Sequence, residues 1–79
     1  MKVAYILINC DLGFEEEVIE NLKDFESVKE VLGTYGAYDI ITKVENLDED
    51  KLRETITWQI RKIPRVRSTL TLMGIEGQN

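Results

Sequence analysis

Two short groups of polar residues in the sequence have the chemistry to hold a small charged ligand. In the run 36–39, Gly-Ala-Tyr-Asp, the absent side chain of Gly36 lets a ligand approach backbone N–H groups, which bind carboxylates, and Asp39 can accept hydrogen bonds from an ammonium. Thr69 and Thr71 are two positions apart, so in a strand their hydroxyls point to the same side. The alternative is a plain hairpin in which Asp39 accepts local backbone N–H groups and both threonines are exposed strand formers. The residues alone leave both interpretations open.

Catalytic and metal chemistry are disfavoured by what the sequence lacks. It contains no histidine and a single cysteine, Cys10, which excludes zinc sites built from Cys and His, Ser-His or Cys-His nucleophiles, and a disulfide within the chain. The carboxylates of residues 15–17 and 48–50 stand at predicted helix starts, where the helix dipole favours anions. The acidic turn 10–13 would repel a phosphate, which argues against acylphosphatase-like catalysis. We therefore predict no enzyme activity, no metal site and no cofactor.

Charge and hydropathy narrow the class of partner. The 79 residues carry a formal net charge of −5, whereas nucleic-acid affinity is carried mostly by clustered Lys and Arg. The basic cluster within 61–67 is short and is typical of a helix end followed by a solvated strand start. No apolar run approaches the ~20 residues that cross a bilayer, and the first ten residues do not resemble a signal peptide. We expect a cytoplasmic protein with no direct nucleic-acid or membrane partner, in which Cys10 is a small apolar residue.

Hydrophobic periodicity predicts six elements in one domain that covers residues 1–79. The predicted strands are 2–9, 28–35, 38–44 and 66–75, and the predicted helices are 14–25 and a second one that is capped by Asp48 and ends before Pro64. Gly36 and Ala37 should form a tight turn between the second and third strands. The order βαββαβ indicates an α+β, ferredoxin-like fold, in which a four-stranded antiparallel sheet carries both helices on one face.

The first strand is apolar on both sides, which predicts a partner for the sheet. Alternation along it gives two sets, Val3, Tyr5 and Leu7 on one side and Ala4, Ile6 and Ile8 on the other. Two helices cover one side only, and a domain of this size buries just about 60% of its unfolded surface. We therefore expect the uncovered face to pack on a second copy, giving a symmetric dimer with an α/β sandwich architecture.

Two further side-chain placements follow from periodicity. In the last strand, alternation puts Val66, Ser68, Leu70 and Leu72 on the side opposite the two threonines. In the second helix, Trp58 lies off the apolar stripe, so it either lies across the helix edge or anchors a contact between dimers.

Three segments taken together resemble the effector domain, often called the RAM domain, of the Lrp/AsnC transcription regulators. The resemblance spans nearly the whole chain and is carried by Tyr35-Gly36-Ala37-Tyr38-Asp39-Ile40, by Ile63-Pro64-Arg65-Val66-Arg67-Ser68-Thr69-Leu70-Thr71, and by Val28, Val31 and the strand leading to Gly36. Arg65 stands where the family usually has glycine, which puts the turn geometry there in doubt. The first strand begins at residue 2, so the chain resembles a stand-alone form without the family's helix-turn-helix module.

This resemblance implies a function, a site and partners. An amino acid effector would bind in the crevice between dimers, four dimers would close into an octamer, and the ligand would act by shifting that assembly. The implied ligand-binding residues are Gly36, Tyr38, Asp39, Thr69 and Thr71. Without a DNA-binding module, the domain could co-assemble with full-length Lrp/AsnC regulators or serve another protein as a metabolite-responsive scaffold.

One rival of similar topology stays open. An ACT-like amino-acid-binding module that regulates a metabolic enzyme usually carries a glycine in the turn between the first strand and the first helix, and Gly13 fits that position. The run 36–39 together with Thr69 and Thr71 favours the Lrp/AsnC interpretation over it.

Overall fold

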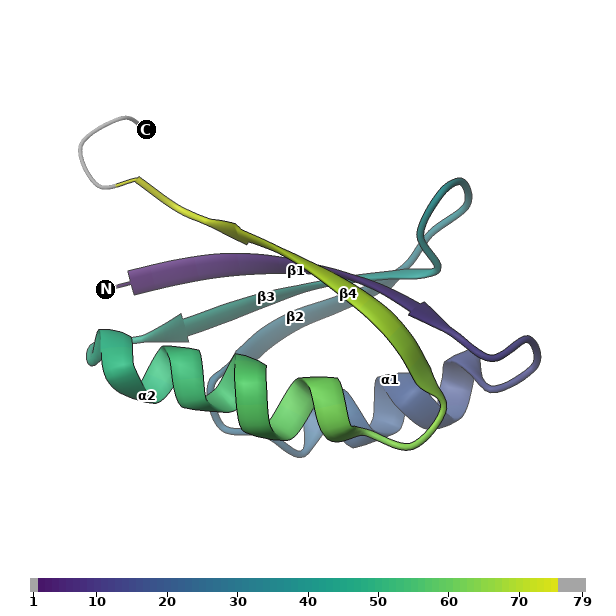
Figure 1. Cartoon of the computed structure of the whole chain (residues 1–79), viewed down its shortest axis with the longest axis horizontal. Coiled ribbons are helices and arrows are strands. Elements are labelled where there is room, and N and C mark those ends of the chain that lie inside the picture. Colours follow the sequence, from purple (N-terminus) through teal and green to yellow (C-terminus); the bar gives the residue numbers. More distant parts are fainter. Residues whose placement is uncertain (1, 76–79) are drawn as a thin grey trace.

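The computed structural model describes residues 2–75, which form one four-stranded sheet with two helical segments. Figure 1 shows the sheet above and both helices below it. The elements in chain order are β1 (Lys2–Cys10), α1 (Glu15–Lys23), β2 (Val28–Gly33), β3 (Ile40–Asn46), α2 (Glu49–Glu54), a π-helical turn (Thr55–Gln59), a 3-10 turn (Ile60–Lys62) and β4 (Val66–Met73). This order confirms the predicted ferredoxin-like α+β fold.

All neighbouring strands in the sheet are antiparallel, in the spatial order β2-β3-β1-β4. The strand β1 is central because it pairs with both β3 and β4: Ala4, for example, lies opposite Val44 on one side and Met73 on the other. Directly opposed residues in antiparallel strands lie on the same face. The register therefore assigns the paired residues of β1, β3 and β4 to a face of the sheet.

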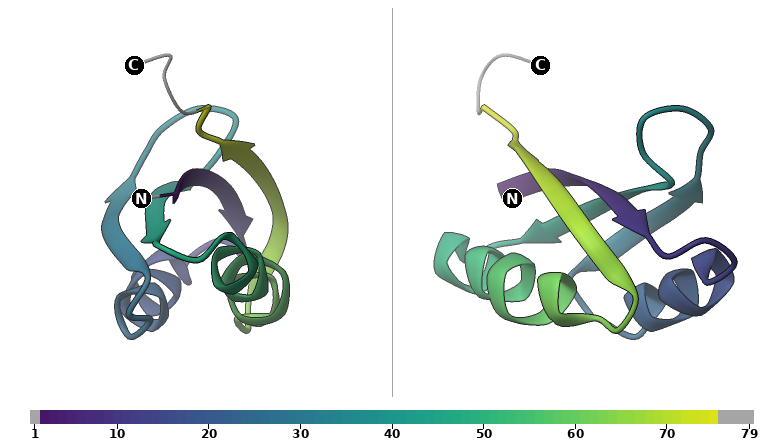
Figure 2. Two further views of the ribbon diagram at one scale, coloured as in Figure 1. Left: turned by 90° about the vertical axis from the view of Figure 1, so that its left-hand side faces the viewer. Right: turned by 45° about the vertical axis from the view of Figure 1, so that its right-hand side comes forward.

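The core lies between the sheet and the helices. On β1 the side chains of Ala4, Ile6 and Ile8 are fully buried, and they belong to one cluster with Val18, Leu22, Ile40, Val44, Leu52 and Ile60. Both helices lie below the same side of the curved sheet, as the end-on view in Figure 2 shows. Val18 and Leu22 of the first helix, and Leu52 and Ile60 of the second helical segment, are therefore the side chains with which the helices cover the sheet.

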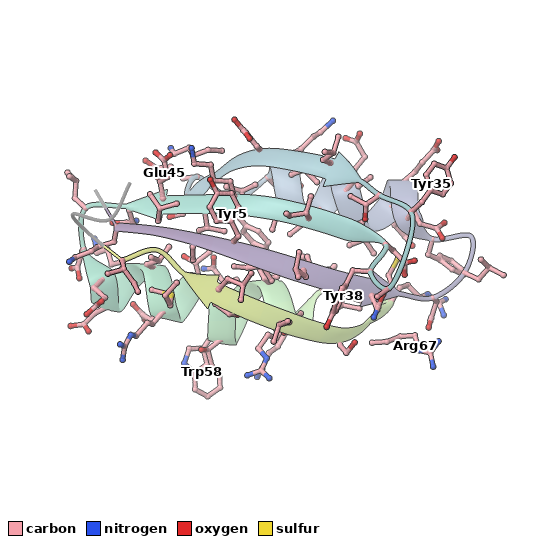
Figure 3. All side chains as sticks on the ribbon, turned by 90° about the horizontal axis from the view of Figure 1, so that it is seen from above. Tyr5, Tyr35, Tyr38, Glu45, Trp58 and Arg67 are labelled. Carbon is pink, nitrogen blue, oxygen red and sulfur yellow. The ribbon has the colours of Figure 1, made fainter. Side chains whose placement is uncertain are left out.

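The opposite face of the sheet is uncovered and largely apolar. The row Leu32, Ile41, Leu7 and Leu70 runs across all four strands on this face. The neighbouring row begins with two charged residues, Glu30 of β2 and Lys43 of β3, and ends with Tyr5, which is 39% exposed, and Leu72, which is 51% exposed. Figure 3 looks down onto this face. The two-sided apolar character predicted for β1 is therefore confirmed, with helices over one side only.

The connection between β2 and β3 is longer than predicted. The tight turn at Gly36 and Ala37 is replaced by a six-residue loop, because β2 ends at Gly33 and β3 begins at Ile40. The backbone N–H of Thr34 donates to the carbonyl oxygen of Asp39 at 2.8 Å, and the Thr34 hydroxyl donates to the carbonyl oxygen of Tyr38 at 2.8 Å. The first bond continues the register of β2 and β3 by one position, but the N–H of Asp39 donates to the carbonyl oxygen of Ile8 in β1 instead of returning a bond to Thr34, so the ladder ends there.

The face predicted for Val66 is wrong. The pairing of β1 with β4 shifts between Asn9 and Cys10: Asn9 lies opposite Ser68, but Cys10 lies opposite Val66. Arg67 is therefore an extra residue, a β-bulge, and the bulge reverses the alternation at the start of β4. Val66 packs against the buried core on the helix side. The apolar side chain gains burial that a regular strand would have denied it.

The ends of the second helical segment follow the sequence closely. The Asp48 carboxylate accepts a hydrogen bond from the backbone N–H of Asp50 at 2.8 Å, which confirms Asp48 as the cap. Ile63, just before Pro64, is extended, with φ −61° and ψ 130°, as a residue before proline should be. Arg65 then adopts φ 77°, in the left-handed region where glycine is favoured. This is the position at which the Lrp/AsnC pattern has glycine.

Candidate functional site

The loop formed by residues 34–39 carries three of the predicted ligand-binding residues. It rises above the uncovered face of the sheet, at the end where β1 runs into the first helix (Figure 1). Gly36 has φ 123°, and a Cβ at that position would meet no atom within 4 Å. Gly36 is therefore required by its backbone conformation, and the space beside it is open. Tyr38 lies toward β1, while Tyr35 points to the other side of the loop (Figure 3).

Asp39 joins this loop to the central strand. Its carboxylate oxygen Oδ2 accepts a hydrogen bond from the backbone N–H of Cys10 at 3.0 Å, and its own N–H donates to the carbonyl oxygen of Ile8 at 2.9 Å. Asp39 thus satisfies a donor at the end of β1, 29 positions away, rather than the local backbone N–H groups that the plain-hairpin interpretation assigned to it. A carboxylate has about four acceptor positions, so Oδ1 keeps its capacity to bind a ligand.

Thr69 and Thr71 point to the same side of β4, as predicted, but this is the side covered by the helices. They lie opposite Ile8 and Ile6 of β1, both of which are fully buried on the helix side. Asn9 and Ser68 also oppose each other, one position further along β1, and so belong to the uncovered side. Within one subunit the structure therefore does not bring the two threonine hydroxyls together with the Asp39 loop.

Two hollows meet at Asp39. One, of about 340 Å³, is lined by Asn9, Cys10, Asp39, Arg67 and Ser68. The other, of about 530 Å³, is lined by Leu12, Glu15, Gly33, Thr34, Tyr35 and Asp39. The first is walled mainly by polar and charged groups, and the second has an exposed leucine and tyrosine on its rim. A polar hollow beside a partly apolar one suits a ligand with a charged head and a less polar side chain.

Arg67, Asn9 and Ser68 are the residues at this place that sequence reasoning missed. The sequence predicts Arg67 to be part of a solvated strand start, whereas the bulge places it on the rim of the polar hollow. A prediction that the end of β1 pairs with the start of β4 would have been enough to place Asn9 close to Ser68. The bulge itself has no sequence signal here, because none of the residues around it is glycine.

The chemistry of Cys10 is that of a buried thiol. The pKa of Cys10 is raised, first by burial and then by the negative charges of Asp39, Glu15 and Asp11. A protonated and inaccessible thiol is a poor nucleophile and a poor metal ligand. Among residues 2–75, no group of three or more His, Cys, Asp or Glu side chains is arranged to hold a metal ion. The same residues include no helix that is both long and apolar enough to traverse a bilayer.

Trp58 lies on the helix side, far from this site in the fold. It is 62% exposed, and the Lys62 ammonium lies 4.8 Å from the centroid of its ring. In Figure 3 its side chain extends beyond the sheet edge on the β4 side. Trp58 thus projects from the helix edge, with one cation already placed against its ring.

Comparison with known proteins gives a consistent result over almost the whole chain. The family model described as Lrp/AsnC ligand binding domain matches residues 3–76. The HTH-type transcriptional regulator FL11 of Pyrococcus abyssi is 34% identical over 74 residues, which are 94% of this chain and 48% of that protein. The homocitrate synthase of Saccharolobus solfataricus is 39% identical over 74 residues, which are 92% of this chain and 16% of the enzyme. This chain thus spans about half the length of the regulator and about a sixth of the enzyme.

A solved structure of similar length agrees with these matches. The hypothetical protein PHS023 from Pyrococcus horikoshii superposes with a TM-score of 0.89 at 41% sequence identity, covering 95% of this chain and 90% of that one. The fold described above, including its strand order, is therefore shared with a protein of nearly the same size.

Proposed function

Because the chain belongs to the Lrp/AsnC ligand-binding domain family, we propose that it is a regulatory domain that senses an amino acid through ligand-linked assembly. The observation that carries this proposal is the uncovered apolar sheet face with the Asp39 loop beside it. One feature supplies a surface for assembly and the other a place for an effector. A ligand that fits better in one assembly than in another shifts the balance between them by its difference in affinity.

The proposed assembly begins with a second copy of this chain on the uncovered face. Leu32, Leu70 and Leu72 are 63%, 44% and 51% exposed, and they lie in neighbouring rows that run across the sheet. Contiguous apolar surface of this kind marks an interaction site, and a domain of this size gains stability that its own core cannot provide. Two sheets packed face to face form the α/β sandwich, and four such dimers would form the octamer.

The proposed effector site includes Gly36, Tyr38 and Asp39 of one subunit. Asp39 keeps one carboxylate oxygen for an ammonium group, and the backbone around Gly36 is open to a carboxylate. Thr69 and Thr71 face the helices in their own subunit. In this proposal they reach the effector only from a neighbouring copy, at a crevice between dimers.

The proposed partners follow from the relatives. A similar segment makes up 48% of a transcription regulator and 16% of a homocitrate synthase, so domains like this one occur in proteins of two different kinds. Co-assembly with full-length Lrp/AsnC regulators is the partnership we propose, in the cytoplasm, where a buried unpaired thiol is stable. The family match does not favour the ACT-like alternative.

Sedimentation velocity at micromolar concentration, with and without each of the twenty L-amino acids, tests the proposal. We expect the wild type to form a dimer or a larger assembly, and one amino acid to change its distribution. Leu70→Asp, on the uncovered face, should give a folded monomer, whereas the matched variant Leu47→Asp, at an exposed leucine before α2, should assemble like the wild type. A monomeric wild type, or an assembly that no amino acid alters, would contradict the proposal.

A further inference from the structure

Arg67 has an exposed, positively charged side chain that makes few contacts with other side chains of this protein. It is the extra residue of the bulge in β4, and bulges re-aim side chains away from the regular alternation of a strand. Its side chain is 71% exposed, and within residues 2–75 its ion-pair contact is a long one, 3.9 Å from Nε to Oδ1 of Asp11. Asp11 is also 3.7 Å from Nη1 of Arg65. A surface contact of this length contributes little, so the guanidinium keeps its donors for another acceptor.

The hollow beside Arg67 combines opposite charges with neutral polar groups. Arg67 and Asp39 contribute one positive and one negative side chain, and Asn9 and Ser68 contribute an amide and a hydroxyl. Figure 3 shows Arg67 and Tyr38 at the same end of the sheet. A guanidinium fork matches the two oxygens of a carboxylate, and a carboxylate accepts the hydrogen bonds of an ammonium. An α-amino acid carries an ammonium and a carboxylate on the same carbon atom, and this hollow offers one partner for each.

From this arrangement we infer that Arg67, rather than the open backbone around Gly36, binds the α-carboxylate of the effector while Asp39 binds its α-ammonium, in the polar hollow that Arg67, Asp39, Asn9 and Ser68 line. This inference rests on the proposed function and adds to it one binding residue, Arg67. The effector is an α-amino acid with both backbone charges present. Its side chain extends toward the second hollow, which shares Asp39 and is lined by Leu12, Thr34 and Tyr35.

Ligands with other charge patterns fit this hollow less well. A phosphate or a dicarboxylate would place its second negative charge near Asp39, and Asp11 and Glu15 lie at the same end of the molecule. An amine without a carboxylate would leave Arg67 unmatched. An N-acylated amino acid would leave Asp39 facing a neutral amide. The zwitterion is the class that satisfies both side chains.

The test is isothermal titration of each of the twenty L-amino acids into the wild type, into Arg67→Ala and into the matched control Arg61→Ala. Arg61 is an exposed arginine on the 3-10 turn, on the helix side. For the amino acid that binds, Arg67→Ala should weaken the affinity by about tenfold to a hundredfold, and Arg61→Ala should leave it unchanged. The decarboxylated amine of that amino acid should bind the wild type as weakly as the amino acid binds Arg67→Ala.

A second variant tests the other charge without disturbing the loop. Asp39→Asn keeps an oxygen that can accept the N–H of Cys10 but removes the negative charge, so it should weaken binding while thermal melting stays close to wild type. If an amino acid binds the wild type and Arg67→Ala equally well, this inference is overturned and the proposed function stands. If none of the twenty binds the wild type, the proposed function fails and the inference fails with it.

Discussion

The carboxylate of Asp39 and the backbone N–H of Cys10 are joined by a hydrogen bond of 3.0 Å across 29 positions of the chain. One residue belongs to the loop between β2 and β3, and the other ends the central strand β1. A second bond, from the Asp39 N–H to the carbonyl oxygen of Ile8, lies directly beside it at 2.9 Å. The loop that we propose to bind the effector is therefore attached to the middle of the sheet.

Replacing Asp39 with alanine should cost stability as well as binding. The N–H of Cys10 is partly buried and would lose its acceptor, so we expect the free energy of unfolding to fall by about 1–3 kcal/mol. Asp39→Asn retains an acceptor oxygen and should lose clearly less. Urea unfolding of both variants measures the difference. Equal losses for alanine and asparagine would show that this hydrogen bond does not stabilise the loop.

Glycine at position 65 should give a more stable protein than alanine, although replacing alanine by glycine usually destabilises a protein. Its φ of 77° strains any residue that has a Cβ, at a cost of roughly 1–2 kcal/mol. Arg65→Gly and Arg65→Ala both remove the packing of the guanidinium on the Phe14 ring, 4.2 Å from its centroid, and its contact with Asp11. The free energy of unfolding of the glycine variant should therefore be about 1 kcal/mol higher than that of the alanine variant. An alanine variant of equal or greater stability would contradict the strain.

Stability should fall as the pH rises above about 8.5, and Cys10 should be one cause. Its pKa is raised in the folded protein, mainly by burial, so the folded state keeps a proton that the unfolded thiol loses near pH 8.5. The contribution of Cys10 to stability is fully present below the pKa of the thiol in the unfolded chain. It is lost as the pH rises through the higher pKa of the thiol in the folded protein. Urea unfolding between pH 7.5 and about 9.5 should give a flatter profile for Cys10→Ala than for the wild type. Parallel profiles would exclude Cys10 as the source.

An ion pair on the uncovered face should influence the dimer that we propose. Lys43 Nζ lies 3.1 Å from Glu45 Oε1, their side chains are 27% and 22% exposed, and the hydrogen bond with Glu45 is the main reason that the pKa of Lys43 is raised. Both residues lie on the face that carries Tyr5 and Val3. Once a second copy covers this face, removing one charge would leave the other unpaired and desolvated.

Sedimentation equilibrium of three variants measures this effect. We expect Lys43→Met and Glu45→Leu each to weaken dimerisation, and the double variant to dimerise as well as or better than the wild type. If the double variant loses as much dimerisation free energy as the two single variants lose together, the ion pair is not buried in the dimer.

The layout of the fold was predictable because it depends on periodicity and on local chemistry. Ala4, Ile6 and Ile8 alternate with Val3, Tyr5 and Leu7, and this pattern alone separated the core from the uncovered face. Asp48 caps a helix through bonds to its near neighbours, and Pro64 ends a helix that precedes it because it forces Ile63 into an extended conformation. Features of this kind need no knowledge of distant residues.

The site was less predictable because it depends on pairing between distant strands. The β2–β3 ladder ends where the N–H of Asp39 turns to Ile8 of β1, and Thr34 closes the loop with bonds to Tyr38 and Asp39. The place of Arg67 follows from a bulge in the ladder between β1 and β4. The doubt raised by Arg65 in place of glycine pointed to a real irregularity, because that residue has a positive φ. The fold could thus be predicted one element at a time, whereas the site required the register.

The central position of β1 also affects how the chain is made. One of its two neighbours, β4, is the last element, and Ala4 lies opposite Met73, almost a full chain length away. Until residues 66–73 have left the ribosome, β1 is an open edge whose unpaired backbone groups and apolar side chains can pair with another nascent chain. Contacts between such distant segments also form slowly. Synthesis on neighbouring ribosomes therefore exposes this domain to strand exchange between nascent copies, before its own last strand closes the sheet.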